Sequence, residues 1–198
     1  MMLIAITGGI GSGKSVVSRM LTVMGYEVYD CDSRAKALMT SDAEVIRLLK
    51  QEFGEEVFLA DGTLNRRHLA AMAFADKEAL HRLNAIVHPA TARDMQRWAI
   101  LQANGGTNVA FIETALLRTA GLDKLVDGVW HVTAPADVRI ERVMARSGLT
   151  AHQVRERINA QSIEDSVADG EQVIINDNDT ALLPQVTHLL ELNRTTKQ

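Results

Sequence analysis

The chain carries the run Gly8-Gly9-Ile10-Gly11-Ser12-Gly13-Lys14-Ser15, which fits the phosphate-binding pattern G-x-x-x-x-G-K-[ST] at every fixed position. The apolar residues 2–6 before it predict a buried strand, and residues 16–21 after it have helical spacing. Glycines let backbone N–H groups turn around phosphate oxygens, and the next helix presents its positive end to them. The stretch therefore predicts a nucleoside triphosphate site.

Two side chains of this loop have expected tasks. Lys14 would reach the β- and γ-phosphates, and the Ser15 hydroxyl would bind Mg²⁺. The alternative is a glycine-rich turn without a ligand, and the agreement of the motif with both flanking segments argues against it. We expect the phosphates to be bound by Gly8, Gly9, Gly11, Ser12, Gly13, Lys14 and Ser15.

Composition excludes several classes of protein. The 198 residues suggest one domain with an inserted lobe, and 46% hydrophobic with 23% charged residues is ordinary for a globular chain. The formal net charge of −4 argues against a general nucleic-acid binder, and no apolar run approaches the ~18 residues of a membrane span. Cys31 is the only cysteine, so an intrachain disulfide or a cysteine zinc site is impossible. We expect a cytoplasmic protein; the oligomeric state stays open.

A pair of carboxylates follows the second predicted strand, residues 27–30. Asp30 and Asp32 stand where that strand ends, and ligands of parallel α/β sheets bind outside the carboxyl ends of the strands. A carboxylate beside an alcohol can accept its proton as the alcohol attacks phosphorus. The alternative is that Asp32 caps a helix over residues 33–39. The two interpretations are compatible, and both stay open.

A long segment, residues 41–103, has an almost wholly helical pattern and predicts a helical lobe inserted in the α/β core. Its helices are expected near residues 42–53, 66–74, 76–87 and 90–101, with Pro89 breaking between the last two. His88 is either a capping or surface residue or a substrate contact. Arg66 is either solvated or holds a phosphate.

The remaining chain predicts three further strands and a lid. Strands are expected at residues 108–112, 128–132 and 173–175; Glu113 ends the first of them as a magnesium-site or capping residue, and Asn176, after the last, would frame the adenine. Arg142 lies between Arg139 and Arg146 at spacings that put all three on one helix face. Arginines on a lid neutralise charge on a transferring phosphoryl group.

With these elements in place, the chain resembles the dephospho-coenzyme A kinases from residue 4 to about residue 190. The most specific match is the run from Ile6-Thr7 through the phosphate loop, which is narrower than the general motif. Further matches are Asp30-x-Asp32, Leu64-Asn65-Arg66, Ala85-Ile86-Val87-His88-Pro89, Arg142 with Arg146, Gly148-Leu149-Thr150, Arg157-x-x-Ala160-Gln161 and Val173-Ile174-x-Asn176.

The resemblance implies transfer of the γ-phosphate of ATP to the ribose 3′-hydroxyl of dephospho-CoA, with Mg²⁺. It implies a P-loop fold of three layers with a five-stranded parallel sheet, in a single kinase domain: a core (1–32, 104–135 and 162–193), a substrate lobe (33–103) and a lid (136–161). Asp32 would be the base. Lys14 and Arg142 would stabilise the migrating group, Arg146 would assist, and Arg66 and His88 would hold dephospho-CoA, with Asp30 beside them.

Some positions depart from the family pattern. Val16 replaces the usual threonine, so a hydroxyl is lost while its backbone N–H can still serve the α-phosphate. After the third strand a Pro-Leu-Leu-Phe-Glu segment is usual; here Ala115, Arg118 and Thr119 replace its proline, phenylalanine and glutamate. Near Glu171 an expected Ala-Asp pair is blurred. These changes concern the lid and the substrate lobe rather than the loop or Asp32.

Two other functions compete with this interpretation. A P-loop kinase acting on a nucleoside monophosphate or another small alcohol would carry the same loop, and substrate competition would distinguish it. A non-catalytic nucleotide-binding protein is the rival from another class, motivated by the changes at Arg118 and Thr119. A GTPase is disfavoured because the chain lacks an Asn-Lys-x-Asp motif.

Overall fold

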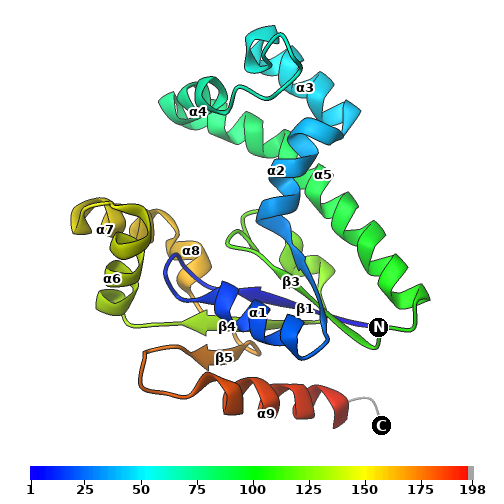
Figure 1. The fold of residues 1–198 in the computed structure, drawn as a ribbon, viewed down its shortest axis with the longest axis vertical. Helices are drawn as coiled ribbons and strands as arrows, with labels where there is room; N and C mark the ends of the chain where they lie inside the picture. Colours follow the sequence, from blue (N-terminus) through cyan, green and yellow to red (C-terminus); the bar gives the residue numbers. More distant parts are fainter. Residues whose placement is uncertain (196–198) are drawn as a thin grey trace. The chain divides into compact units, whose positions relative to one another are not determined.

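The computed structural model describes residues 1–195, with the side chains of all of them except residues 74, 162, 194 and 195. This part of the chain divides into two compact units. The first unit contains Met1–Tyr29 and the chain from Gln102 onward, and the second contains Asp30–Leu101 (Figure 1). The assignment of these parts of the chain as core, substrate lobe and lid stays a prediction.

A five-stranded sheet in the order β2-β3-β1-β4-β5 organises the described chain. Its strands are β1 (Met2–Thr7), β2 (Glu27–Asp30), β3 (Val109–Glu113), β4 (Gly128–Thr133) and β5 (Gln172–Ile175). β1 pairs in parallel with β3 and β4, and β4 pairs in parallel with β5. The predicted α/β class and five-stranded sheet are confirmed.

The core of the first unit lies between this sheet and two helices. Helix α1 (Lys14–Val23) follows the phosphate loop, and α9 (Leu182–Thr195) ends the described chain. Alternate residues of a strand point to opposite faces, so Ile4 and Ile6 of β1 share one face. They pack in a single buried cluster with Leu21 of α1 and Val186 of α9. This packing anchors the start of the phosphate loop on a buried strand.

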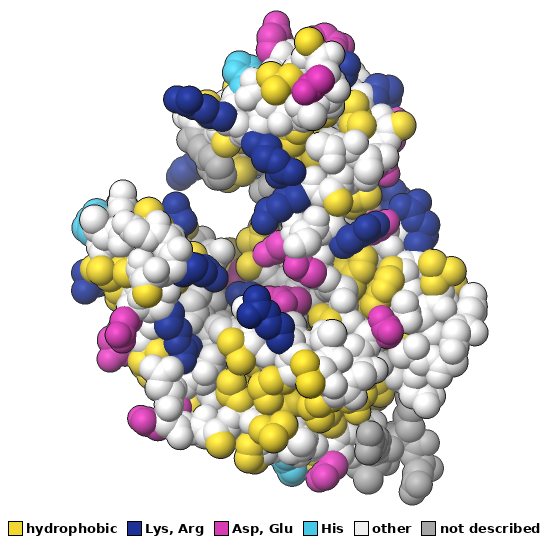
Figure 2. Space-filling view, in the orientation of Figure 1, with side chains coloured by type: hydrophobic (Ala, Val, Ile, Leu, Met, Phe, Trp, Pro, Cys, Tyr) yellow, Lys and Arg dark blue, Asp and Glu magenta, His cyan; other side chains and the backbone are white. Residues whose placement is uncertain are grey.

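Strand β5 is an edge of the sheet, and a side chain of α9 covers its backbone. The Gln185 carboxamide accepts from the Ile175 N–H at 2.8 Å and donates to the Ile175 carbonyl oxygen at 2.9 Å. Val173, Ile175 and Leu183 are exposed here, between 43 and 55%. Figure 2 shows hydrophobic side chains gathered over the lower part of the first unit, where β5 and α9 lie.

The predicted lid corresponds to helices α6 (Ala136–Ser147) and α7 (Ala151–Ala160) of the first unit. Gly148 ends α6 in the left-handed conformation, with φ of 68°. Thr150 and Gln153 form a capping box that begins α7. The single-turn helix α8 (Ser162–Asp165) follows, and a 3₁₀ turn (Leu122–Leu125) precedes β4.

The second unit is helical. It contains α2 (Cys31–Ser41), α3 (Ala43–Phe53), a 3₁₀ turn (Glu55–Val57), α4 (Arg66–Ala75) and most of α5 (Lys77–Asn104). Asp42 caps α3, because its carboxylate accepts the N–H groups of Glu44 and Val45. The core of the second unit contains Leu38, Leu49, Phe53 and Leu69. Among the helices of residues 1–195, none has the length and apolar character needed to cross a membrane.

The predicted break at Pro89 is wrong, because Pro89 lies inside α5, a continuous helix of 28 residues. Proline removes one helical hydrogen bond and usually ends or kinks a helix. Here Val87, Ala90, Thr91 and Met95 are buried on either side of it, so packing holds the helix together. The Thr91 hydroxyl also donates to the Val87 carbonyl oxygen at 2.9 Å. Tertiary packing therefore outweighs the local penalty.

Candidate active site

The phosphate loop joins β1 to α1 and turns on glycines. Gly13 is the N-cap of α1 with φ of 96°, and a Cβ there would lie 2.0 Å from Asn176 Nδ2. Gly8 has φ of 139°, and its Cβ would lie 2.1 Å from the Val132 carbonyl oxygen. Both conformation and space therefore require glycine at these positions. The loop has the tight backbone turn that phosphate binding at a helix N-terminus uses.

Lys14 begins α1 and lies across the loop. Its ammonium donates to the carbonyl oxygens of Gly8, at 2.7 Å, and Gly9, at 3.3 Å. The positive charge is thereby held at the loop, beside the positive end of the α1 dipole. This geometry supports the predicted contact of Lys14 with phosphate.

Ser15 and Glu113 are the candidate protein ligands for Mg²⁺. Ser15 is exposed in the first turn of α1, and Glu113 is half-buried at the end of β3. Within the described residues, no three His, Cys, Asp or Glu side chains cluster as a metal site. Mg²⁺ at nucleotide sites takes only one or two protein ligands and completes its shell with phosphate and water. A hydroxyl and a carboxylate are hard oxygen donors that fit this ion.

Arg142 and Asn176 meet at the phosphate loop. One guanidinium nitrogen of Arg142 lies 3.4 Å from the Gly11 carbonyl oxygen and 3.5 Å from that of Ser12. The other donates to Asn176 Oδ1 at 3.2 Å and to the side-chain oxygen of Asn178. Asn176 is buried and donates to the Ser12 carbonyl oxygen at 2.8 Å. Asn176 therefore braces the loop and Arg142, a role that its predicted place beside the adenine did not include.

The three arginines of α6 have different surroundings. Arg139 is only 8% exposed; its Nε donates to the Ile10 carbonyl oxygen at 2.8 Å, and it pairs with Asp165 at 3.0 Å. Arg142 is half-buried, and Arg146 is exposed. The helical spacing of the three was read correctly, but Arg139 supports the loop instead of presenting a charge to solvent.

Asp30 is the last residue of β2 and caps α2, and Asp32 lies two residues later. The Asp30 carboxylate accepts from the Ser33 N–H at 2.9 Å and from the Ser33 hydroxyl at 2.6 Å. Helix α2 begins at Cys31, two residues before the predicted start, so Asp32 lies exposed in the first turn. The alternative that Asp32 caps the helix is therefore wrong. Its predicted role as base stays a prediction.

Arg66 and His88 also lie in the second unit. Arg66 is exposed at the first position of α4, where Asn65 caps the helix by accepting the His68 N–H at 3.2 Å. An arginine at a helix N-terminus is well suited to an anion. His88 is half-buried within α5, directly before Pro89, and burial lowers its pKa. Their predicted contacts with the acceptor substrate remain open to test.

The departures at Arg118 and Thr119 are accommodated by a local polar network. The Arg118 guanidinium pairs with Glu171 at 2.5 Å and donates to the Ile163 carbonyl oxygen at 3.2 Å. The buried Glu164 carboxylate accepts the backbone N–H groups of Arg118, at 3.2 Å, and Thr119, at 2.8 Å. The segment after β3 is thus tied to the chain that leaves the lid.

Folding stability is expected to fall as the pH is lowered below about 6.5. Burial lowers the pKa of His88 and His131 from 6.5 in the folded chain, although Glu171, 3.3 Å from His131 Nδ1, opposes the shift there. The unfolded chain therefore binds protons first on acidification, which favours unfolding. Thermal unfolding between about pH 7.5 and 5.5 should show a falling Tm.

The matched control for this pH dependence is the double variant His88→Gln/His131→Gln, whose Tm should vary less over the same range. The pKa of Glu44 is lowered from 4.5, and those of Asp61 and Asp177 from 3.8, by hydrogen bonds to their carboxylates. These groups lose their contribution only at lower pH. A Tm that is constant or rises on acidification would contradict the prediction.

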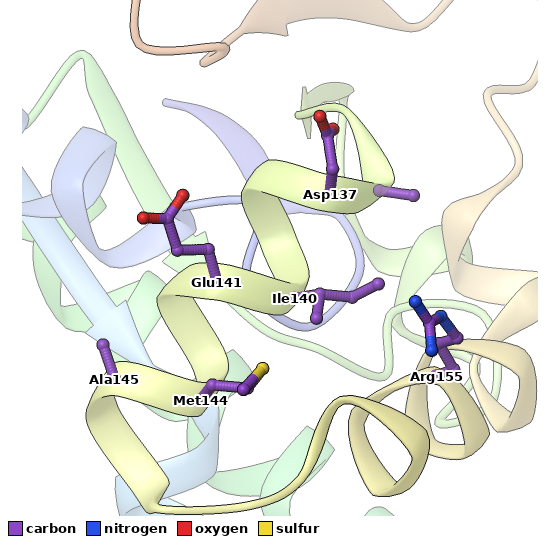
Figure 3. Close-up of a pocket in the computed structure, with 7 residues that line it drawn as sticks. Asp137, Ile140, Glu141, Met144, Ala145 and Arg155 are labelled. Carbon is purple, nitrogen blue, oxygen red and sulfur yellow. The ribbon is translucent and has the colours of Figure 1, made fainter.

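A separate pocket of about 660 Å³ lies along the lid. It is lined by six residues of α6 between Ala136 and Ala145 and by Arg155 of α7 (Figure 3). Ile140 and Met144 point toward it, on the opposite side of α6 from the contacts of Arg139 and Arg142. The pocket is therefore distinct from the phosphate-loop site.

Sequence reasoning missed how many residues act on the phosphate loop. Asp165 and Asn178 received no role, Arg139 was considered only as one of three arginines on a lid face, and Gln161 was noted only as part of a family motif. The Gln161 carboxamide accepts the Ile10 N–H at 3.0 Å across 151 residues of sequence. No local sequence pattern indicates such contacts, because they join residues that are far apart in the sequence and meet only in the folded chain.

Comparisons with known proteins point to one family. The family model described as dephospho-CoA kinase matches residues 2–182. A dephospho-CoA kinase from Porphyromonas gingivalis is 39% identical over 197 residues, which cover 98% of this chain and 96% of the relative.

Solved structures share the fold of this chain. A crystal structure of a Thermus thermophilus protein has a TM-score of 0.74 at 32% identity, covering 100% of this chain and 98% of that one. A dephospho-CoA kinase from Campylobacter jejuni has a TM-score of 0.71 at 20% identity, covering 99% and 98%. At that identity the second likeness shows the fold alone.

Proposed function

Because the chain belongs to the dephospho-CoA kinase family, and so catalyses ATP-dependent phosphorylation of dephospho-CoA in coenzyme A synthesis, we propose that the phosphate loop and Arg142 carry out the transfer. The acceptor is the ribose 3′-hydroxyl, and the products are CoA and ADP. The observation that carries the assignment is the Arg142 guanidinium, 3.4 Å from the Gly11 and 3.5 Å from the Ser12 carbonyl oxygen. Phosphoryl transfer depends chiefly on positioning and charge stabilisation.

The donor side of the reaction belongs to the first unit. Backbone N–H groups of the loop and the start of α1 cradle the ATP phosphates, with Val16 serving the α-phosphate through its backbone. Lys14, already held at the loop, reaches the β- and γ-phosphates. Arg146, exposed one turn beyond Arg142 on α6, assists in neutralising charge.

Mg²⁺ would be held by the Ser15 hydroxyl, with the Glu113 carboxylate acting through water, and phosphate oxygens would complete its shell. When bound, the ion neutralises phosphate charge and orients the γ-phosphate. A cytoplasmic location remains part of the proposal and is supported only by composition.

The acceptor side is assigned to residues of the second unit. Asp32, exposed in the first turn of α2, accepts the proton of the attacking hydroxyl or orients it. Its support is its place directly after the carboxyl end of β2, because strand ends of this kind bind ligands. Asp30, Arg66 and His88 hold dephospho-CoA, with the Arg66 guanidinium suited to its phosphate groups.

The test is ADP release from Mg²⁺-ATP with and without dephospho-CoA. The expected result is acceptor-dependent ADP and a product identified as CoA, with phosphorus on the 3′-oxygen by NMR coupling. Chelation of Mg²⁺ with EDTA should abolish turnover, and added Mg²⁺ should restore it. Phosphorylation of a nucleoside monophosphate without any turnover of dephospho-CoA would overturn the proposal.

A further inference from the structure

Both polar backbone groups of Ile10, at the apex of the phosphate loop, are bound by side chains at the two ends of the lid. The Ile10 N–H donates to Gln161 Oε1 at 3.0 Å, where the chain leaves α7. The Ile10 carbonyl oxygen accepts from Arg139 Nε at 2.8 Å, in the first turn of α6. The two ends of the predicted lid therefore bind the same residue of the loop, Ile10.

An ion pair between Arg139 and Asp165 supports one of these two contacts. The Arg139 side chain is 10% exposed and that of Asp165 is 21% exposed, and they pair at 3.0 Å. The ion pair with Asp165 on α8 holds the Arg139 guanidinium in place. Its Nε is thereby kept in position to donate to the Ile10 carbonyl oxygen.

The loop packs closely against these groups at two of its glycines. A Cβ on Gly9 would lie 1.7 Å from Asp165 Oδ1 and 2.2 Å from a guanidinium nitrogen of Arg139. A Cβ on Gly11 would lie 2.7 Å from the Arg139 carbonyl oxygen. The loop backbone is therefore in close contact with Arg139 of α6 and with Asp165 of α8.

We propose that Gln161 and Arg139 are positioning residues, which set the conformation of the phosphate loop through the two backbone groups of Ile10 and so couple nucleotide binding to the lid. This inference rests on the proposed function only in taking the loop as the ATP site. Both side chains act through the backbone of Ile10. Their effect is on the loop amides that bind the nucleotide, so it falls on ATP rather than on the acceptor.

Gln161→Met tests the proposal because it keeps the length of the side chain and removes the acceptor of the Ile10 N–H. Loss of one such hydrogen bond should raise KM for ATP about three- to tenfold, with KM for dephospho-CoA changed less than about twofold. Amide hydrogen exchange of the loop, measured without nucleotide, should speed up at Ile10.

Gln153→Met is the matched control. Gln153 also belongs to the lid, and its carboxamide likewise accepts a backbone N–H, that of Thr150, at 2.9 Å. The control removes this hydrogen bond, and the one from the Thr150 hydroxyl at 3.2 Å, without touching the loop, so its loop exchange and KM for ATP should match the wild type. Arg139→Lys, which keeps a cation for Asp165, should raise KM for ATP less than Arg139→Met.

Two results would overturn the inference. One is exchange at Ile10 in Gln161→Met that equals that of the wild type and of Gln153→Met. The other is a fall in Tm with equal losses for both substrates, which would mark Gln161 as merely structural. Because the exchange is read without nucleotide or acceptor, a wild type that fails to phosphorylate dephospho-CoA would refute the proposed function while leaving this test intact.

Discussion

Replacing Arg142 with methionine is expected to lower kcat about 10³-fold, the loss typical of an arginine that stabilises a transferring phosphoryl group. Its guanidinium is the group that the structure places at the Gly11 and Ser12 carbonyls, from a helix of the lid. Methionine keeps the apolar stem and removes the charge. Steady-state kinetics with ATP and dephospho-CoA would measure the effect.

Arg155→Met is the control for this charge effect, since Arg155 is an exposed lid arginine that lines the separate pocket. It should keep kcat within about twofold of the wild type. Tm must be measured in parallel, because Arg142 also binds Asn176 and Asn178. A kcat in Arg142→Met close to that of Arg155→Met, with both proteins folded, would exclude a role in transfer.

Asp32→Asn is expected to lower turnover about 10²-fold or more while ATP binding stays nearly intact. An amide cannot accept the proton of the attacking hydroxyl, although it keeps the shape of the side chain. Single-turnover formation of CoA would measure the chemical step, and calorimetric titration with ATP would measure binding.

Asp42→Asn provides the comparison for Asp32, because it makes the same change at the start of another helix. Asp42 caps α3 through the N–H groups of Glu44 and Val45, and asparagine caps helices as well as aspartate does. Its turnover should stay within about twofold of the wild type. If Asp32→Asn behaves like Asp42→Asn, Asp32 is only a favourable charge in the first turn of α2.

The sequence predicted those parts of the fold that local patterns specify. The phosphate loop, its flanking strand and helix, and the strand Glu27–Asp30 depend on motif and periodicity, and the structure reproduces them. The helix break predicted at Pro89 was wrong because the packing of buried neighbours outweighs the energetic cost of a proline in a helix. The sequence does not reveal that these neighbours are buried. The cap of α2 is Asp30, whereas Asp32 had been considered for it, because the exact end of a helix is the part that a sequence pattern predicts least well.

The candidate site was predicted unevenly for the same reason. Lys14 and Ser15 follow from the loop motif, whereas the importance of Arg142 came from helix spacing and a family resemblance. The second set of loop contacts, from Arg139 and Gln161, depends on pairs more than 100 residues apart in sequence, and Asp165 adds to it through its ion pair with Arg139. Charge and spacing could mark Arg139 as basic, but only the folded lid shows that its charge is buried.

The carboxamide of Gln185 has a consequence for the behaviour of the enzyme in concentrated solution. An edge strand with unpaired backbone groups and apolar side chains is a template on which other chains can add and aggregate. At Ile175 both outward backbone groups already have a partner, supplied by a side chain of the same molecule. Gln185 thus occupies, at Ile175, the hydrogen-bonding position that an added strand would need, although it lies far along the chain from the phosphate loop.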